Sequence, residues 1–273
     1  MSYTDTYFVI SRYKENIDWI KSYATNYLIY NKGEELVGYN QKLQPNFGAN
    51  QYDICHFIHE NYENLPDVIA FLQGDPFDHC LIDRFNVLIQ NKKFTPLFGD
   101  KNYPNGEYYE NNTSWYINGE FNSNRPKCKV SSFDEFANLI FANYKHQERL
   151  IFPPGSQFIV EKERCTYYSK NFWKNIMSFI NTDIGINGGR EAHIVERCMQ
   201  LIFENPLVVI LYVLACGSLA YHLAHGFQSA FKTIGVHNKR YHTLISCIGY
   251  GFAIIIPLTF AMMPISFYFK WVN

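Results

Sequence analysis

The chain lacks the cysteine patterns that indicate a disulfide framework or a zinc knuckle. Its seven cysteines are dispersed through 273 residues, and none belongs to a C-x-x-C pair. An odd, scattered set of this kind is typical of reduced thiols in a cytosolic compartment. The amino terminus also has no basic segment followed by an apolar one, so we expect no cleaved signal peptide.

An excess of charge of either sign is missing as well. The 24 Lys and Arg residues nearly balance the 25 Asp and Glu residues, and no long basic run exists. We therefore expect no nucleic-acid partner. In contrast, hydrophobic residues make up 47% of the chain and aromatic residues 18%, which excludes a disordered protein.

Charged residues are absent from two long stretches near the carboxyl terminus, residues 206–224 and 243–269. About 20 apolar residues cross a bilayer as a helix, so these stretches predict a hairpin of two transmembrane helices, with the lipid bilayer as a partner. The alternative is a pair of buried core helices. We therefore predict a multi-pass membrane protein with two spans.

The orientation of this hairpin rests on two cues that conflict. The connecting loop, residues 225–242, is basic, and basic loops prefer the cytoplasmic side. This preference would place residues 1–203 across the membrane, although no signal sequence leads them there. Because long amino-terminal domains without a signal usually remain in the cytosol, we favour a cytosolic domain.

The first 203 residues alternate between short apolar runs and segments of helical periodicity. Residues 7–11, 27–30 and 68–72 read as strands, and residues 16–24 and 51–62 as the helices between them. Strands that alternate with helices imply a mostly parallel sheet with flanking helices. We predict one α/β domain over residues 1–203.

A cluster of polar side chains follows the apolar run at residues 68–72. Asp75, Asp78 and His79 come directly after it, and ligands of open α/β sheets bind beyond the carboxyl ends of the strands. Carboxylate and imidazole groups suit a divalent cation, here manganese or magnesium. The alternative is an ordinary Asp-Pro turn, since both residues favour turns.

Several segments together resemble a family of uncharacterised domains of unknown function. The matching blocks are ISRYKENIDWI (10–20), YLIYNKGE (27–34), IHENYENLPDVIAFLQGDPFDH (58–79), PPGSQFIVEKERC (153–165) and EAHIVERCMQLIF (191–203). The resemblance covers most of residues 7–203 and is not expected to extend into the carboxyl-terminal tail. That family is similar, more distantly, to glycosyltransferases of the A-type fold.

This second resemblance implies a glycosyltransferase-like protein that uses a nucleotide sugar, a glycan acceptor and a divalent metal. A metal would neutralise the diphosphate leaving group. The residues implied are Asp75, Asp78, His79 and His193 for the metal, Gln157 for the acceptor pocket, and Glu191 or Glu196, with no way to choose between them, for the catalytic base. Arg12 and Glu15 would contact the nucleotide, or would form a surface pair.

One block departs from the pattern of the family. Residues 46–50 read Asn-Phe-Gly-Ala-Asn, where the family carries an Arg and a Glu. The spacing of Asp75 and Asp78 also exceeds that of a DxD motif by one residue. The alternative function is therefore a non-enzymatic membrane protein whose α/β domain has lost catalysis.

Overall fold

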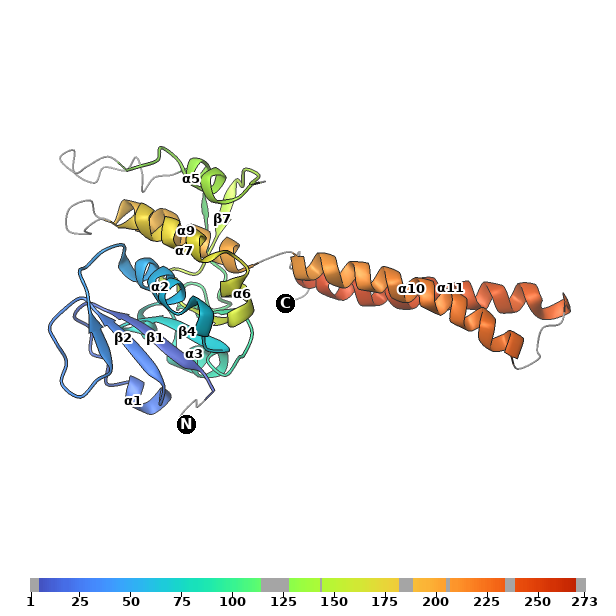
Figure 1. The fold of residues 1–273 in the computed structure, drawn as a ribbon, viewed down its shortest axis with the longest axis horizontal. Helices are drawn as coiled ribbons and strands as arrows, with labels where there is room; N and C mark the ends of the chain where they lie inside the picture. Colours follow the sequence, from blue (N-terminus) through green and yellow to red (C-terminus); the bar gives the residue numbers. More distant parts are fainter. Residues whose placement is uncertain are drawn as a thin grey trace. The chain divides into compact units, whose positions relative to one another are not determined.

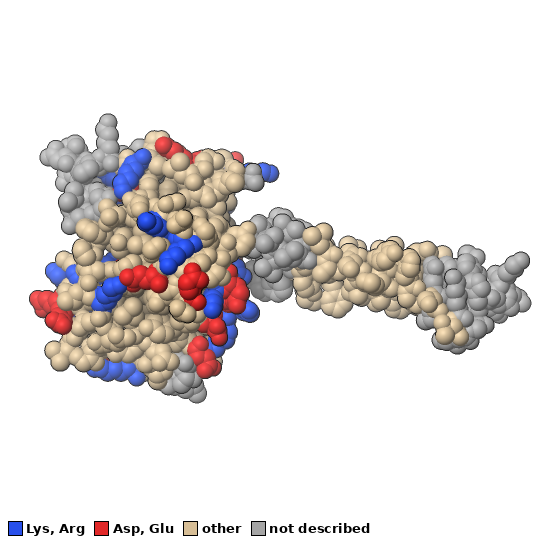
Figure 2. All heavy atoms as spheres, viewed as in Figure 1, with Lys and Arg blue, Asp and Glu red and all other residues tan. Residues whose placement is uncertain are grey.

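The computed structural model describes residues 5–113, 128–142, 144–181, 189–204, 207–233 and 239–268. The chain divides into two compact units, Met1–Glu204 and Asn205–Asn273. On the face of the first unit that Figure 2 shows, Lys and Arg side chains are interspersed with Asp and Glu, with no broad patch of one sign.

A six-stranded sheet with the order β3-β2-β1-β4-β8-β5 forms the centre of the first unit. Its strands are β1 (Tyr7–Arg12), β2 (Tyr27–Asn31), β3 (Gln41–Leu43), β4 (Val68–Gln73), β5 (Thr95–Pro96) and β8 (Phe158–Glu161). The first four run parallel, and β8 pairs antiparallel with both β4 and β5. A separate two-stranded sheet joins β6 (Tyr109–Asn111) to β7 (Arg149–Ile151).

Helices cover both faces of the larger sheet (Figure 1). The helices of the first unit are α1 (Ile20–Tyr23), α2 (Ala49–Glu60), α3 (Ile82–Leu88), α5 (Phe133–Ile140), α6 (Lys162–Thr166), α7 (Lys170–Ile180) and α9 (Arg190–Phe203), with short 3-10 turns η1 (Tyr62–Asn64) and η2 (Pro76–Asp78). The buried side chains of α2, α7 and α9 join one hydrophobic cluster, and those of α1 and α3 join the other. The sheet is thus the middle layer of three.

The alternation of side chains along the central strands explains the two clusters. In β4, Ile69 and Phe71 point into the cluster under α2, whereas Ala70 and Leu72 point into the cluster under α1 and α3. Successive strand residues face opposite sides of a sheet, so a parallel strand covered on both faces reads as a continuous apolar run. This is the reason that the sequence of β4 shows no polar alternation.

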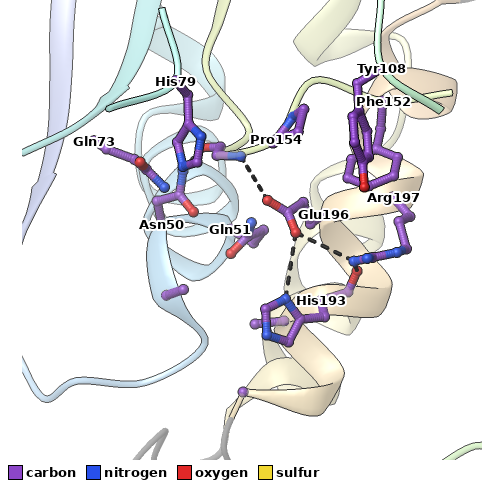
Figure 3. A pocket seen from close by; sticks show the side chains of 14 residues that line it. Asn50, Gln51, Gln73, His79, Tyr108, Phe152, Pro154, His193, Glu196 and Arg197 are labelled. Atoms are coloured by element: carbon purple, nitrogen blue, oxygen red, sulfur yellow. Dashed lines mark hydrogen bonds and ion pairs between the residues drawn. The ribbon is translucent and has the colours of Figure 1, made fainter. Parts of the chain in front are cut away.

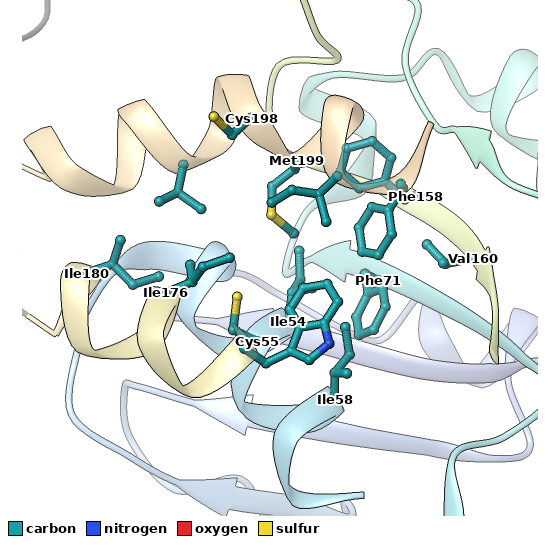
Figure 4. Close-up of a cluster of buried hydrophobic side chains, with 14 of the residues drawn as sticks. Ile54, Cys55, Ile58, Phe71, Phe158, Val160, Ile176, Ile180, Cys198 and Met199 are labelled. Atoms are coloured by element: carbon teal, nitrogen blue, oxygen red, sulfur yellow. The ribbon is translucent and has the colours of Figure 1, made fainter. Parts of the chain in front are cut away.

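The larger cluster is built from long side chains of α2, α7, α9 and the central strands (Figure 4). Trp173 of α7 is fully buried there, and its indole N–H donates to the carbonyl oxygen of Cys165 at 2.9 Å. The hydrogen bond satisfies the single polar atom of the ring, so the whole indole contributes apolar burial. Phe71 of β4 and Phe57 of α2 meet edge to face, with ring centroids 6.0 Å apart.

The α/β part of the sequence prediction agrees with this unit, which is mixed α/β with a mostly parallel sheet. Several elements were not predicted, among them β3, α3 and β7. Strand β3 has only three residues, of which two are polar, and α3 follows η2 within the region where we predicted a site. The sequence predicts an irregular stretch over residues 91–130, but β5 and β6 lie within it, and its residues 114–127 are outside the described residues.

The second unit contains α10 (Leu207–Thr233) and α11 (Lys239–Tyr268), which pack against each other. The ring of Phe227 lies over Gly249, where a β-carbon would come within 2.5 Å of its Cδ1 atom. The same ring stacks on Phe252, with centroids 6.2 Å apart. A glycine at position 249 therefore allows the close approach of the two helices.

The predicted transmembrane hairpin over residues 206–224 and 243–269 is contradicted. In the described part of the chain, no helix is both long and apolar enough to cross a membrane. The expectation of a two-span membrane protein, drawn from the length of two charge-free stretches, is corrected accordingly.

Candidate functional site

A pocket of about 430 Å³ lies at the carboxyl end of β4. Five segments frame it: the first turn of α2, the segment from β4 to His79, Tyr108 before β6, residues 152–155 before β8, and one face of α9 (Figure 3). The pocket is on the side where the parallel strands end, which is the usual place for ligands in open α/β sheets. Its position therefore agrees with the edge that the sequence predicted.

The first turn of α2 enters the pocket in an unusual backbone conformation. Gly48 and Ala49 both have positive φ angles, 53° and 50°. A β-carbon at Gly48 would lie 2.8 Å from the carbonyl oxygen of Ile180, so only glycine fits there. Lys32 holds this turn, because its ammonium group donates to the carbonyl oxygens of Phe47, at 3.1 Å, and of Ala49.

Two amide side chains of α2 tie this turn to the segment before β8. Asn50 donates from Nδ2 to the carbonyl oxygen of Gly155 at 2.5 Å, and Gln51 donates from Nε2 to Oγ of Ser156 at 3.0 Å. Both side chains are buried and line the pocket. These contacts join residues more than one hundred positions apart and so fix one wall of the pocket.

Glu196 of α9 is the central charged group of the pocket. Its Oε1 atom accepts a hydrogen bond from the backbone N–H of Gly155 at 2.8 Å. Its Oε2 atom lies 3.5 Å from Nδ1 of His193 and 3.4 Å from Nη1 of Arg197. Burial favours the neutral acid, but His193, Arg197 and the Gly155 N–H together outweigh it and lower the pKa of Glu196 below its ordinary value. Glu196 is therefore ionised at neutral pH.

Arg197 is held rigidly beside this carboxylate. Its guanidinium forms a two-pronged pair with Glu110 of β6, in which Nη2 lies 2.9 Å from Oε2, and it also donates to the carbonyl oxygen of His193 at 2.8 Å. The same group lies over the ring of Phe152, 4.6 Å from its centroid. Paired with Glu110, Arg197 positions Glu196 and leaves the local charge close to balanced.

His79 lies across the pocket from α9, against Gly155 (Figure 3). A β-carbon at Gly155 would come within 2.5 Å of Cδ2 of His79, and Gly155 has a φ of 84°. Glycine is thus required at position 155 for two reasons: it adopts the positive φ angle, and it leaves space for the imidazole of His79. His79 and His193 are the two imidazoles that line the pocket.

Of the predicted site residues, His79, His193 and Glu196 line this pocket. Glu191 does not: it is buried, and its Oε1 atom accepts from the backbone N–H of Lys129 at 3.2 Å. Of the two glutamates that the sequence offered as the catalytic base, Glu196 is the one that lines the pocket.

The predicted metal centre at Asp75, Asp78, His79 and His193 is contradicted. Among the described residues, no group of three or more His, Cys, Asp or Glu side chains lies close enough to hold a metal ion. Asp75 instead starts η2, where its Oδ1 atom accepts from the N–H of Phe77 at 3.0 Å, and Asp78 is exposed. The Asp-Pro sequence therefore makes the turn that was the alternative interpretation.

Three other predicted residues are held by the chain itself, outside the lining of the pocket. Gln157 is fully buried and bridges the end of β4 to η2, with bonds to the N–H of Gln73 and the carbonyl oxygen of Pro76. Arg12 donates to Oδ1 of Asn31 at 2.8 Å. Glu15 accepts from two backbone N–H groups of the turn that follows β1. All three organise the carboxyl edge of the sheet.

The sequence did not identify the amide side chains Asn50 and Gln51 or the arginine Arg197 as site residues. A signal for the first of them was present, because Asn50 belongs to the block that departs from the family pattern. Gln51 and Arg197 carry no local pattern, since their partners lie far away in the sequence.

A family described as a protein of unknown function, DUF3431, matches residues 8–217. The chain belongs to this family. No curated protein and no solved structure matches the chain significantly. The more distant resemblance to A-type glycosyltransferases consequently has no support from these comparisons.

The DUF3431 match covers every segment that frames the pocket. It also continues past residue 203 to residue 217, which lies inside α10. The expectation that the family resemblance ends before the carboxyl-terminal tail is therefore wrong. The DUF3431 region includes the first part of the second unit.

Proposed function

We propose that the pocket binds a hydroxylated, carbohydrate-like ligand and that the protein transfers a glycosyl group to one of its hydroxyls. The lining supports such a ligand, because the amides of Asn50, Gln51 and Gln73 face the same space as the rings of Tyr108 and Phe152. Pockets of this kind combine apolar walls with a few polar groups that fix the orientation of the ligand.

The pair formed by Glu196 and His193 is the observation that carries the proposal. Glu196 lies beside Nδ1 of His193, and a carboxylate there favours the tautomer with its proton on Nδ1. The lone pair of Nε2, on the opposite side of the ring, is then able to accept a proton. The side chain of His193 is 44% exposed, so a ligand can reach it.

In the proposed step, Nε2 of His193 removes the proton of the acceptor hydroxyl as its oxygen attacks the anomeric carbon of the donor. The bond from that carbon to the leaving group breaks, and the leaving group departs with the electron pair. Glu196 stabilises the imidazolium that forms, as a carboxylate does in general-base pairs. A nucleotide sugar is the proposed donor and a glycan the proposed acceptor, which follows the resemblance seen in the sequence.

The test is transfer activity of the full chain against a panel of nucleotide sugars and glycan acceptors. Glu196→Gln and His193→Gln should each lower kcat by about 100-fold or more, the usual contribution of a general base. The matched control is His59→Gln on α2, whose side chain is outside the pocket lining. Unchanged rates in both pocket variants would contradict the proposal.

A second candidate is a binding domain without turnover. Two cations near the edge of the sheet, Arg12 and Lys32, favour this candidate. Both are already paired with groups of the chain itself, so their charges are not directed at a nucleotide-sugar donor. Under this alternative, a glycan binds wild type and Glu196→Gln with similar affinity, and no donor is consumed. Calorimetric titration of both proteins with acceptors that bind separates the two candidates.

A further inference from the structure

We propose that the amino end of α2 is an oxyanion site, which takes a phosphate or carboxylate group of the ligand in the same pocket. The proposal rests on the proposed function, because it specifies the ligand as an acidic sugar, such as a sugar phosphate or a uronic acid. Two independent features of the pocket support it.

The first feature is the unshielded first turn of α2. The N-cap residue, Gly48, has no side chain that could cap this turn, and the turn contains no acidic residue. Ala49, Asn50 and Gln51, the first residues of this 12-residue helix, all line the pocket. The first N–H groups of a helix have no partner within it, and the helix dipole favours negative charge there. Helix starts of this kind bind phosphate and carboxylate.

The second feature is the side chain of Gln51. It is 3% exposed, yet its Oε1 atom has no hydrogen-bond partner among the described residues. A buried carbonyl without a partner is costly, and buried polar groups are normally paired. Because Gln51 lines the pocket, a hydroxyl of a bound ligand is the donor that would complete it. An anion and an adjacent hydroxyl are the combination that an acidic sugar presents.

The surrounding charges permit an anion at this place. The 14-residue helix α9 also begins at the pocket, through Gly189 and Ala192. Its dipole adds positive potential there, which the carboxylate of Glu191 in its first turn partly offsets. The carboxylate of Glu196 opposes an anion, but the N–H of Gly155, His193 and Arg197 already surround it. His193 stands on α9 between Glu196 and the start of that helix (Figure 3).

The test uses the full chain with inorganic phosphate and with acetate, each compared with sodium chloride at equal ionic strength. Two quantities are followed: the midpoint of thermal unfolding and the hydrogen exchange of the backbone amides at residues 48–52. We expect a saturable rise of the midpoint, because ligands that bind only the folded state stabilise it. We also expect slower exchange at residues 48–52. The anion that gives the larger response shows whether the site prefers a phosphate or a carboxylate group. Equal responses show that it accepts both.

Gln51→Glu should weaken the binding of the anion by at least about tenfold, since it places a like charge beside it. The control is Gln90→Glu, which makes the same charge change at an exposed position and should leave affinity unchanged. No response beyond that of chloride in wild type, or equal affinity in Gln51→Glu, overturns the oxyanion site. The exchange measurement needs no variant, so it stands even if Gln51→Glu fails to fold.

The two proposals fail in different ways. If wild type binds the oxyanion and transfers no glycosyl group, the proposed function is wrong and the site stands. If the protein glycosylates neutral acceptors and shows no response to either anion, the site is wrong and the proposed function stands.

Discussion

Asp53, which is buried, and Glu196, which is partly buried, are both carboxylates on helices beside a basic side chain, but their surroundings differ. Asp53 of α2 lies 3.0 Å from Nζ of Lys32, and each of these side chains is 2% exposed. Glu196 of α9 faces a pocket and is paired with His193, whose side chain is 44% exposed. One pair is closed to solvent, and the other opens to a ligand.

The closed pair, Lys32 and Asp53, has all its hydrogen-bond partners within the chain. The ammonium group of Lys32 has three protons and three acceptors: Asp53 and the carbonyl oxygens of Phe47 and Ala49. Asp53 accepts further bonds from Ser11 and Gln44. Burial nevertheless raises the pKa of Asp53 to about 6. This pair fixes the turn before α2 and is not available to a ligand.

The comparison shows which kind of buried charge is structural and which is suited to chemistry. A pair in which all the protons and both carboxylate oxygens have partners within the chain holds the backbone in place. A pair with one exposed member is able to exchange a proton with a ligand. The following predictions test this difference.

The largest difference is expected in stability. Lys32→Met leaves Asp53 buried without its cation and should lower the free energy of unfolding by about 3–5 kcal/mol. His193→Ala removes a half-exposed partner and should cost no more than about 1 kcal/mol. Urea unfolding of the two variants measures both values. Similar losses of unfolding free energy in the two variants would show that the two pairs do not differ in this way.

The two carboxylates should also give opposite dependences of stability on pH. The pKa of Asp53 is raised in the folded state, from 3.8 to about 6, so wild type should lose stability relative to Asp53→Asn as the pH rises from 4 to 6, by up to about 3 kcal/mol. The pKa of Glu196 is lowered from 4.5. Its contribution is present above pH 4.5 and lost as the pH falls below it, so wild type should lose stability relative to Glu196→Gln on acidification.

Urea unfolding of wild type, Asp53→Asn and Glu196→Gln at a series of pH values checks both signs. Slopes of the same sign for the two carboxylates would show that their environments do not differ as described.

A smaller effect is expected where the pocket wall meets His79. Gly155→Ala places a β-carbon at 2.5 Å from the imidazole and at a φ of 84°. The variant should lose about 1–2 kcal/mol of stability, because alanine is strained at positive φ. Gly217→Ala, in a helix with open space around that position, is the control and should be neutral or slightly stabilising. An unchanged unfolding midpoint for Gly155→Ala would contradict the close packing of His79 against Gly155.

The smallest effect concerns the first turn of α2, which Lys32 holds. Ala49 has a φ of 50°, a conformation that costs an L-residue roughly 1–2 kcal/mol, so Ala49→Gly should stabilise the protein by up to about 1 kcal/mol. Ala192→Gly, in the ordinary helical conformation of α9, should instead destabilise it by about 1 kcal/mol. Thermal unfolding of both variants gives the comparison, and a loss of stability in Ala49→Gly would contradict it.

The sequence was informative where a local pattern specifies the structure. The apolar runs of β1 and β4 are long enough to be recognised, and their parallel arrangement follows from the helices between strands. Strand β3, Gln41–Leu43, is short and polar, so only its pairing with β2 identifies it. The predicted membrane hairpin came from a criterion of missing charge, which does not by itself establish a membrane span.

The site was predictable only in part, because several of its contacts join residues that are far apart in the sequence. His79 was named because it follows an apolar strand, and His193 and Glu196 because the resemblance to glycosyltransferases implies them. The role of Glu196 depends on the N–H of Gly155, 41 positions away, and no local pattern encodes that contact. The turn at Asp75 shows the opposite case, in which a local hydrogen bond to Phe77 explains a residue assigned to a metal.

The measurement that tests the account most directly is the rate of glycosyl transfer by wild type and Glu196→Gln at saturating donor and acceptor. We expect measurable transfer by wild type and a fall of kcat by about 100-fold or more in the variant, with its fold intact by circular dichroism. Transfer by Glu196→Gln at the rate of wild type would contradict the central claim that the open pair of Glu196 and His193 performs the chemistry.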